Sequence, residues 1–449
     1  MMSPTHHVYG DEFRGREKSL PGAHAPWVRA LRTHAMETFM EGGFPDTRVE
    51  EWKYTDVRNL ARHHFTTIPG VRSLDESALQ SRLQTGKPAH QLVFVDGHHA
   101  PELSPFNTLP NGVTLSSLAF ALVNRPEELE TWLGRNTDLE KPGFNAFNTA
   151  FMCDGAYIRL APGAVIEQPV HLVFIATGKP DTVATLRNLI VAGPGSKAQI
   201  VESYLSLDDA VYLTNTVTEL IVGDGADIEH CKLEQESESA YHMAGIYVSQ
   251  HRDSRYSSHN IALGGRLVRN DLVVTLDEPG ADCTLNGLYL TRGRQHVDNH
   301  TRIDHCKPRA SSREWYKGVL DEHSRAVFNG RVVVHQDAQQ TDARQSNHNL
   351  LLSNEAEADA QPQLEIYADD VKCAHGCTVG RLDEEAMFYL RSRAIDTPTA
   401  RNLLIHAFAA DVLQRIRIAS VRRDLEEQLI GRLRGGGIPD MYTNQEHVT

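Results

Sequence analysis

Four stretches of the sequence start alike, with turn residues, an alanine and then a β-rich run: Pro162-Gly-Ala164-Val-Ile166, Pro194-Gly-Ser-Lys-Ala198-Gln-Ile200, Asp224-Gly-Ala226-Asp-Ile228 and Pro279-Gly-Ala281-Asp-Cys283. The four alanines are 34, 28 and 55 residues apart, and the last spacing is close to twice the shorter unit. A loose repeat of this kind is typical of the coils of a solenoid. We therefore predict a β-helix, in which a small alanine at each corner lets neighbouring coils stack closely.

The β-rich texture extends from about residue 156 to Asp383. Within it, runs such as 198–205 and 214–222 alternate imperfectly between apolar and polar residues, as strands with one face inward do. A β-sandwich or a barrel would show similar short strands, so periodicity alone leaves these alternatives open.

Helical patterns lie on both sides of this core. Before it, apolar residues from Trp27 to Phe39 recur at steps of three and four, and Gly42-Gly43 would end that helix. We expect the following loop to pack Trp52 and Tyr54 against the same helix. The sequence thus predicts three units: a helical or mixed domain (1–155), a β-helix (156–382) and a C-terminal helical domain (383–449).

The C-terminal unit differs in charge from the rest of the chain. Thr397 before Pro398 predicts a helix N-cap. The segment from 391 to 434 contains nine Arg and five acidic residues. The whole chain instead has 45 Lys+Arg and 59 Asp+Glu, a net charge of −14. The Arg-rich helices are either a docking element or the solvated face of a structural pair.

Composition excludes several functional classes. A net charge of −14 argues against a nucleic-acid or anionic-membrane surface over the whole molecule. No apolar run reaches the roughly 18–20 residues of a membrane span, and the first residues have neither signal- nor transit-peptide character. We therefore expect a cytoplasmic protein with free thiols. Since P-loop, G-x-S-x-G and Rossmann motifs are all absent from the sequence, ATP-driven work would need a nucleotide-binding partner.

The densest group of metal-ligating residues is Cys373, His375 and Cys377. On a strand these side chains share one face, but the outer two are roughly 13 Å apart at ~3.3 Å per residue. They can close on one metal only if Gly376 bends the chain. We interpret the group as half of a thiolate and imidazole site, completed by another chain or used transiently. The alternatives are a buried thiol pair with an ordinary histidine, or a self-sufficient metalloprotein.

Several longer segments together resemble the SufB/SufD family of iron–sulfur cluster assembly scaffolds. They are Phe328–Val334, Gln339–Ser353, Pro362–Gly376 and Phe388–Ile395, with Glu50–Thr55 near the N-terminus. The Trp52-Lys-Tyr54 segment and the Lys372-Cys-Ala-His-Gly376 form are similar to SufD rather than to SufB members. A carbohydrate-active β-helix enzyme would need clustered acids on one strand face, which the sequence lacks.

The resemblance implies a right-handed parallel β-helix between helical domains, and a non-catalytic scaffold role. It implies a complex in which a SufB subunit pairs with this chain through the β-helices and a SufC ATPase docks on the C-terminal helices; a homodimer is a further expectation. Cys373 and His375 would hold iron or a transient iron–sulfur cluster jointly with SufB, whereas the role of Cys377 stays open. The candidate docking residues for the ATPase are Arg391, Arg393, Arg401, Phe408, Arg415 and Arg417.

Overall fold

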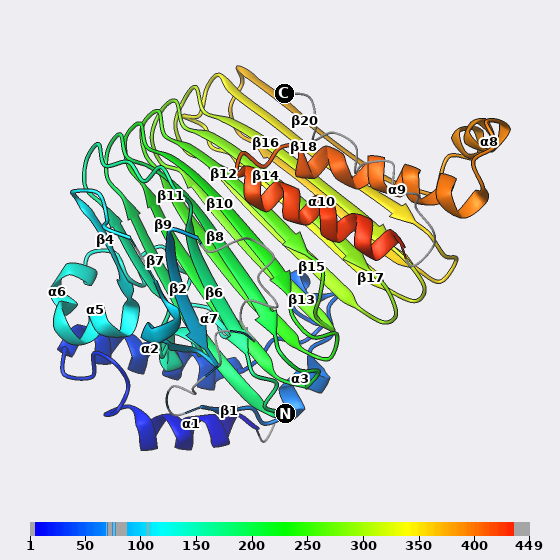
Figure 1. The fold of residues 1–449 in the computed structure, drawn as a ribbon. Helices are drawn as coiled ribbons and strands as arrows, with labels where there is room; N and C mark the ends of the chain where they lie inside the picture. Colours follow the sequence, from blue (N-terminus) through cyan, green and yellow to red (C-terminus); the bar gives the residue numbers. More distant parts are fainter. Residues whose placement is uncertain are drawn as a thin grey trace.

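The computed structural model describes residues 5–68, 70, 74, 77, 88–105 and 107–434. Its centre is a parallel β-solenoid of about seven turns, in which each coil contributes one strand to each of two facing sheets (Figure 1). The predicted β-helix is therefore confirmed, and the sandwich and barrel alternatives are excluded.

The two sheets, called sheet A and sheet B, are built as follows. Sheet A contains β4 (Val113–Ser117), β5 (Ala156–Leu160), β7 (Thr182–Ala192), β9 (Leu213–Val222), β11 (Tyr241–Gln250), β13 (Leu267–Leu276), β15 (His296–His305), β17 (Arg325–Val334) and β19 (Glu357–Ile366), with β1 (Thr66–Thr67) beside β7. Sheet B contains β3 (His98–His99), β2 (His90–Val95), β6 (Val170–Ala176), β8 (Lys197–Ser206), β10 (Asp227–Gln235), β12 (Arg255–Ala262), β14 (Asp282–Thr291), β16 (Ser311–Leu320), β18 (Thr341–Leu351) and β20 (Val371–Gly380). Only the pairs β4–β5 and β2–β3 are antiparallel among the described strands.

Each corner between coils combines a left-handed residue with a small buried one. Strand register aligns Ala164, Ser196, Ala226, Ser254, Ala281 and Ala310 in one column. The residue before each has a positive φ, and in four of the six corners it is glycine, which adopts this conformation without strain. The prediction of a small residue at each corner is confirmed, but Ala198 is not the corner residue of its coil. It lies two residues into β8, and Ser196 occupies the corner.

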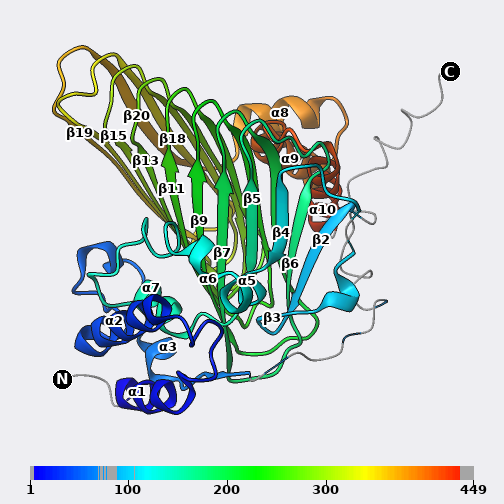
Figure 2. The same ribbon diagram turned by 90° about the vertical axis from the view of Figure 1, so that its left-hand side faces the viewer.

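The N-terminal helices pack against the first coils. They are α1 (Thr5–Arg16), α2 (Pro26–Gly42), α3 (Arg58–Arg62), α5 (Leu118–Asn124), α6 (Pro126–Leu129) and α7 (Phe144–Phe151), with the short turns η1 (Glu50–Trp52) and η2 (Pro101–Leu103). The predicted end of α2 is confirmed, because Gly43 has a φ of +65° and donates its N–H to the carbonyl of Phe39. In Figure 2, α1 and α2 lie at the lower end of the molecule, whereas β19 and β20 lie at the upper end.

The loop after α2 does not pack as predicted. Trp52 stacks near Phe144 of α7, with ring centroids 5.5 Å apart, and the Arg269 guanidinium lies 3.8 Å from its ring. The Tyr54 hydroxyl accepts a hydrogen bond from Gln361 of β19 at 2.8 Å. This segment therefore crosses the outer face of sheet A, where Arg269 donates a hydrogen bond to the Glu51 carbonyl and Asp298 accepts one from Thr55.

The C-terminal helices are α8 (Glu384–Ser392), α9 (Thr397–Leu413) and α10 (Ala419–Arg434). Asp396 caps α9 by accepting the N–H of Thr399, so the N-cap is one residue earlier than predicted. Apolar residues of α9 and α10 pack on the outer face of sheet B, which they cross in Figure 1. The helix stop expected at Gly435-Gly-Gly437 lies outside the described residues. None of the described helices has the length and apolarity to cross a membrane.

The boundaries of the three predicted units stay a prediction. Strands β2 and β4 come before residue 156 in the chain, yet they extend sheet B and sheet A. The hydrophobic core of the solenoid accordingly includes Leu92, Phe94 and Leu115 from that part of the sequence.

We expect Ala281→Leu to destabilise the solenoid. Ala281 is 1% exposed at a corner where adjacent coils meet, so a larger side chain forces them apart, at a cost of about 1–3 kcal/mol. The free energy of unfolding from urea titration measures the effect. Ala407→Leu, at an exposed site on α9, is the matched control. Equal stability of the two variants would contradict close stacking at the corner.

Candidate functional site

The last coil of the solenoid has two free strand edges. β20 pairs only with β18, and β19 only with β17, among the described strands. A strand edge presents unpaired N–H and C=O groups that can pair with another chain. The end of the solenoid is therefore open to a partner along both sheets.

Cys373, His375 and Cys377 lie side by side on β20. Their register partners on β18 are Ala343, Gln345 and Asn347, all buried inside the solenoid. The three donors thus share the inner face of sheet B, as predicted from the alternation of a strand. Because no coil covers them, they line the open end.

The three donors differ in exposure. Cys373 is half-buried and packs against the solenoid core, while His375 and Cys377 are exposed. Burial raises the pKa of the Cys373 thiol, opposed by a hydrogen bond from the backbone of Ala343. A metal ion or a cationic neighbour would be needed to favour the thiolate.

The strand geometry keeps the two thiols apart. β20 continues without interruption from Val371 to Gly380, so Gly376 does not bend it. Cys373 and Cys377 are therefore roughly 13 Å apart along the strand. A single ion can bind His375 with one neighbouring thiolate, and the remaining ligands must come from elsewhere.

The opposite side of the open end is apolar. Inner positions of β19 carry Ala358, Ala360, Pro362, Leu364 and Ile366, which follow core residues of β17 in register. Beside them, Ile366, Tyr367 and Val379 are 41%, 62% and 48% exposed. Exposed apolar groups at a free sheet edge indicate a protein-interaction surface.

Helix α8 forms a second exposed surface. Phe388 and Tyr389 are 74% and 57% exposed, and Figure 1 shows α8 projecting away from the sheets. A groove of about 450 Å³ separates it from the solenoid and is lined by Leu351, Leu352, Arg381, Leu382, Glu384, Met387, Phe388 and Arg391. Helix α8 contributes no fully buried residue to the fold.

The six residues predicted to dock the ATPase occupy two different environments. Arg391 and Arg393 are exposed at the end of α8, where the Arg393 guanidinium lies 4.9 Å from the Tyr389 ring. The other four contact the solenoid: Arg401 pairs with Asp321, Arg417 pairs with Asp227, Arg415 covers Trp315, and Phe408 lies beneath Lys317. Their role in partner binding stays a prediction.

A group of charged residues inside the solenoid was missed by the sequence analysis. Glu202, His230, Lys232, Glu234, Glu236 and His242 are all buried there. Most of them occupy inward positions of their strands. In the sequence, a polar residue at such a position only interrupts the alternation of apolar and polar residues. The strand register is needed to recognise that these residues point into the solenoid.

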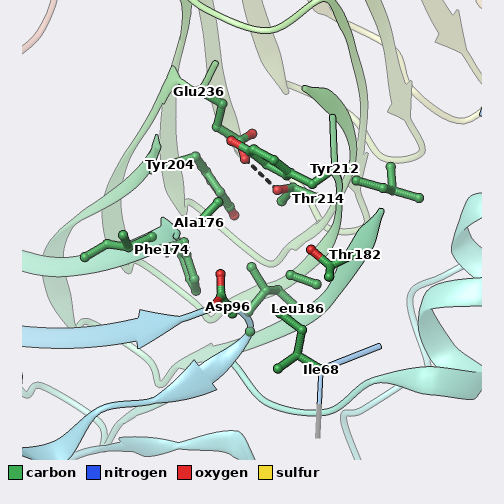
Figure 3. Close-up of a pocket in the computed structure, with 14 residues that line it drawn as sticks. Ile68, Asp96, Phe174, Ala176, Thr182, Leu186, Tyr204, Tyr212, Thr214 and Glu236 are labelled. Atoms are coloured by element: carbon green, nitrogen blue, oxygen red, sulfur yellow. Dashed lines mark hydrogen bonds between the residues drawn. The ribbon is translucent and has the colours of Figure 1, made fainter. Parts of the chain in front are cut away.

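Glu236 borders a small cavity between the first coils (Figure 3). It accepts hydrogen bonds from Thr214 Oγ1 at 2.5 Å, and its other oxygen lies 2.6 Å from His242 Nδ1. The cavity, with a volume of about 20 Å³, has space for a water molecule but not for a substrate. Burial raises the pKa of Glu236 to about 7, against the opposing effects of Thr214 and Lys232.

Comparisons with known proteins identify relatives that match most of this chain. A family model described as "SufBD protein N-terminal region" matches residues 3–172, and "SUF system FeS cluster assembly, SufBD core domain" matches residues 174–408. The iron–sulfur cluster assembly protein SufD of Escherichia coli is 31% identical over 435 residues, 96% of each chain. A SufBD family protein of Synechocystis is 34% identical over 392 residues, 85% of this chain and 86% of its own. SufD of Bacillus subtilis is 27% identical, covering 89% of this chain and 92% of its own.

We expect the contribution of Glu236 and Glu314 to the free energy of unfolding to fall as pH rises from about 4.5 to 7, while His171 and His305, whose pKa burial lowers to about 4, contribute in the opposite direction. Burial raises the pKa of Glu236 and of Glu314 to about 7, so the folded chain holds protons that the unfolded chain has released. Each group contributes a loss on the order of 3 kcal/mol across this range. Between pH 5 and pH 7.5, urea unfolding of Glu236→Gln should show a free energy of unfolding that falls less, or rises more, than that of wild type. Glu127→Gln, at an exposed site, should leave the dependence unchanged.

Proposed function

The chain belongs to the SufBD family of iron–sulfur cluster assembly proteins, as its resemblance predicted, and from this premise we propose that it is a SufD-type scaffold subunit. In this proposal it is non-catalytic and works in a complex with a SufB-type paralogue and a SufC-type ATPase. The observation that carries the proposal is the row of Cys373, His375 and Cys377 at the open end of the solenoid.

The half-site requires a second chain to complete it. His375 binds iron as a neutral imidazole, and Cys373 binds it as a thiolate. These two ligands leave positions for a thiolate of the SufB-type partner, so iron or a nascent cluster is held between the subunits as cargo. The apolar residues of β19 opposite the donors exclude water once the partner is seated.

The partner adds to the two free edges of the last coil. β-Strand addition along β19 and β20 satisfies their unpaired backbone groups, and Ile366, Tyr367 and Val379 become buried. The same edges also accept a second copy of this chain, so a homodimer is the expected state without the paralogue.

Helix α8 is the proposed docking element for the ATPase. It presents Phe388 and Tyr389 to solvent with Arg391 beside them, a combination frequent in binding hot spots. The sequence has no P-loop of its own, so nucleotide binding is assigned to the partner.

Movement of α8 reaches the solenoid through α9. Asp411 of α9 accepts a hydrogen bond from Trp315 Nε1 at 3.0 Å and pairs with Lys317 Nζ at 2.8 Å. Both partners lie on β16, two strands along sheet B from β20. In this proposal, ATP-driven approach of the docked ATPases pulls on this contact and opens the site at β20.

We expect His375→Ala to abolish cluster build-up while the three-subunit complex still forms. The imidazole is exposed and makes no contribution to the core, so only the ligand is lost. Anaerobic iron and sulfide reconstitution of the co-purified complex, followed by absorbance, measures the clusters. His323→Ala, at an exposed corner, is the control. Clusters at the wild-type level in His375→Ala would refute the ligand role.

We expect Phe388→Asp to weaken ATPase binding at least tenfold. The change places a charge at the centre of an exposed apolar surface without touching the fold. Calorimetric titration with the purified ATPase subunit gives the affinity, and Ala407→Asp on exposed α9 is the matched control. Unchanged affinity in Phe388→Asp would place the docking surface elsewhere.

A further inference from the structure

A second set of metal-ligating side chains lies on the outer face of sheet B. Glu229 and Cys231 are two residues apart on β10, and His259 stands directly opposite Cys231 on β12. All three are buried, at 0%, 0% and 1% exposure. One ligand atom from each, a carboxylate oxygen, Sγ and an imidazole nitrogen, lies within 4.8 Å of the other two.

The distance between His259 and Glu229 matches that of two ligands in a tetrahedral site. His259 Nε2 lies 3.2 Å from Glu229 Oε1. Two donors at 2.0–2.1 Å from a zinc ion with a tetrahedral angle between them are about 3.3 Å apart. Moreover, Nε2 is fully buried, and its contact with Oε1 does not have the geometry of a good hydrogen bond. A buried polar atom of this kind requires a ligand or another explanation.

Asn286 on β14 supplies the outer support that a ligating histidine needs. It follows His259 in register, and its Nδ2 lies 3.3 Å from His259 Nδ1. Its Oδ1 is buried without a hydrogen-bond partner in the described part of the chain. Turning the amide by 180° lets Oδ1 accept the proton of Nδ1, which leaves the Nε2 lone pair directed at Glu229.

The surroundings of Glu229 leave one oxygen for an ion. Oε2 accepts a hydrogen bond from Gln199 at 2.8 Å and lies 3.2 Å from Arg417 Nε. Oε1 accepts the Arg417 backbone N–H, at 2.7 Å, and faces His259. The Arg417 guanidinium also pairs with Asp227 at 2.9 Å, so it is held away from Oε1.

We propose that Glu229, Cys231 and His259 form a binding site for a divalent ion of the zinc class, separate from the donors on β20. Binding releases the Cys231 thiol proton to solvent, and His259 stays neutral with its proton on Nδ1. The thiolate and the carboxylate together balance the charge of the ion. A water molecule takes the fourth position.

The site lies beneath the connection between α9 and α10. Ile416 and Ile418, on either side of Arg417, belong to the same apolar cluster as Cys231. A bound ion therefore ties this connection to the solenoid and stabilises the seating of both helices. Metal enters when residues 416–418 lift from sheet B, so loading is slow.

Cobalt titration of the full chain tests the site. Cys373→Ser and Cys377→Ser are introduced first, so that the open end contributes no thiolate signal. We expect one equivalent of Co²⁺ to give a thiolate-to-metal charge-transfer band and tetrahedral ligand-field bands, both removed by excess Zn²⁺. Cys231→Ser should lose the charge-transfer band, whereas Cys283→Ser, at a buried thiol on the inner face, should retain it.

Two results would overturn the proposal. The first is the absence of a charge-transfer band in the starting chain, which requires no variant at the site. The second is a band that survives Cys231→Ser, with circular dichroism confirming the fold. Asn286→Ala gives a milder check: we expect the band to persist and the Co²⁺ affinity to fall about 10–100-fold. Unchanged affinity would count against the histidine orientation on which the site depends.

Discussion

The register between successive coils is the constraint from which the other features of this protein follow. At each corner the N–H of the left-handed residue donates to a carbonyl of the next coil, from Gly195 to Asp224, from Gly225 to Arg252 and from Gly280 to Pro308. These bonds fix each strand beside its equivalent in the next coil, so every inner strand is paired on both sides. Among the described strands, free edges remain only at the ends of the solenoid. At the first end, the short antiparallel strands β3 and β4 pair with the outermost parallel strands. The last coil has no such cover among the described strands, and it carries the Cys and His donors.

The corners that contain glycine were predicted from the sequence, and the corners that lack glycine were not. Ser254 and Ala310 occupy the same column as Ala226 and Ala281, but Asp253 and Arg309 take the left-handed position before them. A corner without glycine has no clear signal in the sequence. The doubled spacing between Ala226 and Ala281 still indicated a missing coil. Ala198 was placed wrongly because Ser196, equally small, precedes it by two residues.

The candidate site was predictable in one respect only, the shared face of Cys373, His375 and Cys377. That property is local, since it depends on alternation within one strand. The exposure of the row depends on β20 being the last strand, and the apolar surface opposite depends on the register of β19 with β17. In the same way, Cys231 meets His259 only through a pairing across 28 residues. Non-local register decides these contacts, and no short pattern encodes it.

The outer face of sheet B is covered unevenly, and this affects local stability. Along most of its length the outer face is covered by α9 and α10, whose apolar residues bury Val201, Cys231, Ile261 and Leu288. At β20 that cover ends, and nearly every side chain of the strand is exposed. Regions with few buried contacts open at the lowest cost in free energy. Because α9 is anchored on β16, a pull on the helices acts on the covered strands next to this weak end. The last coil is therefore the part of the solenoid that opens at the lowest cost in free energy.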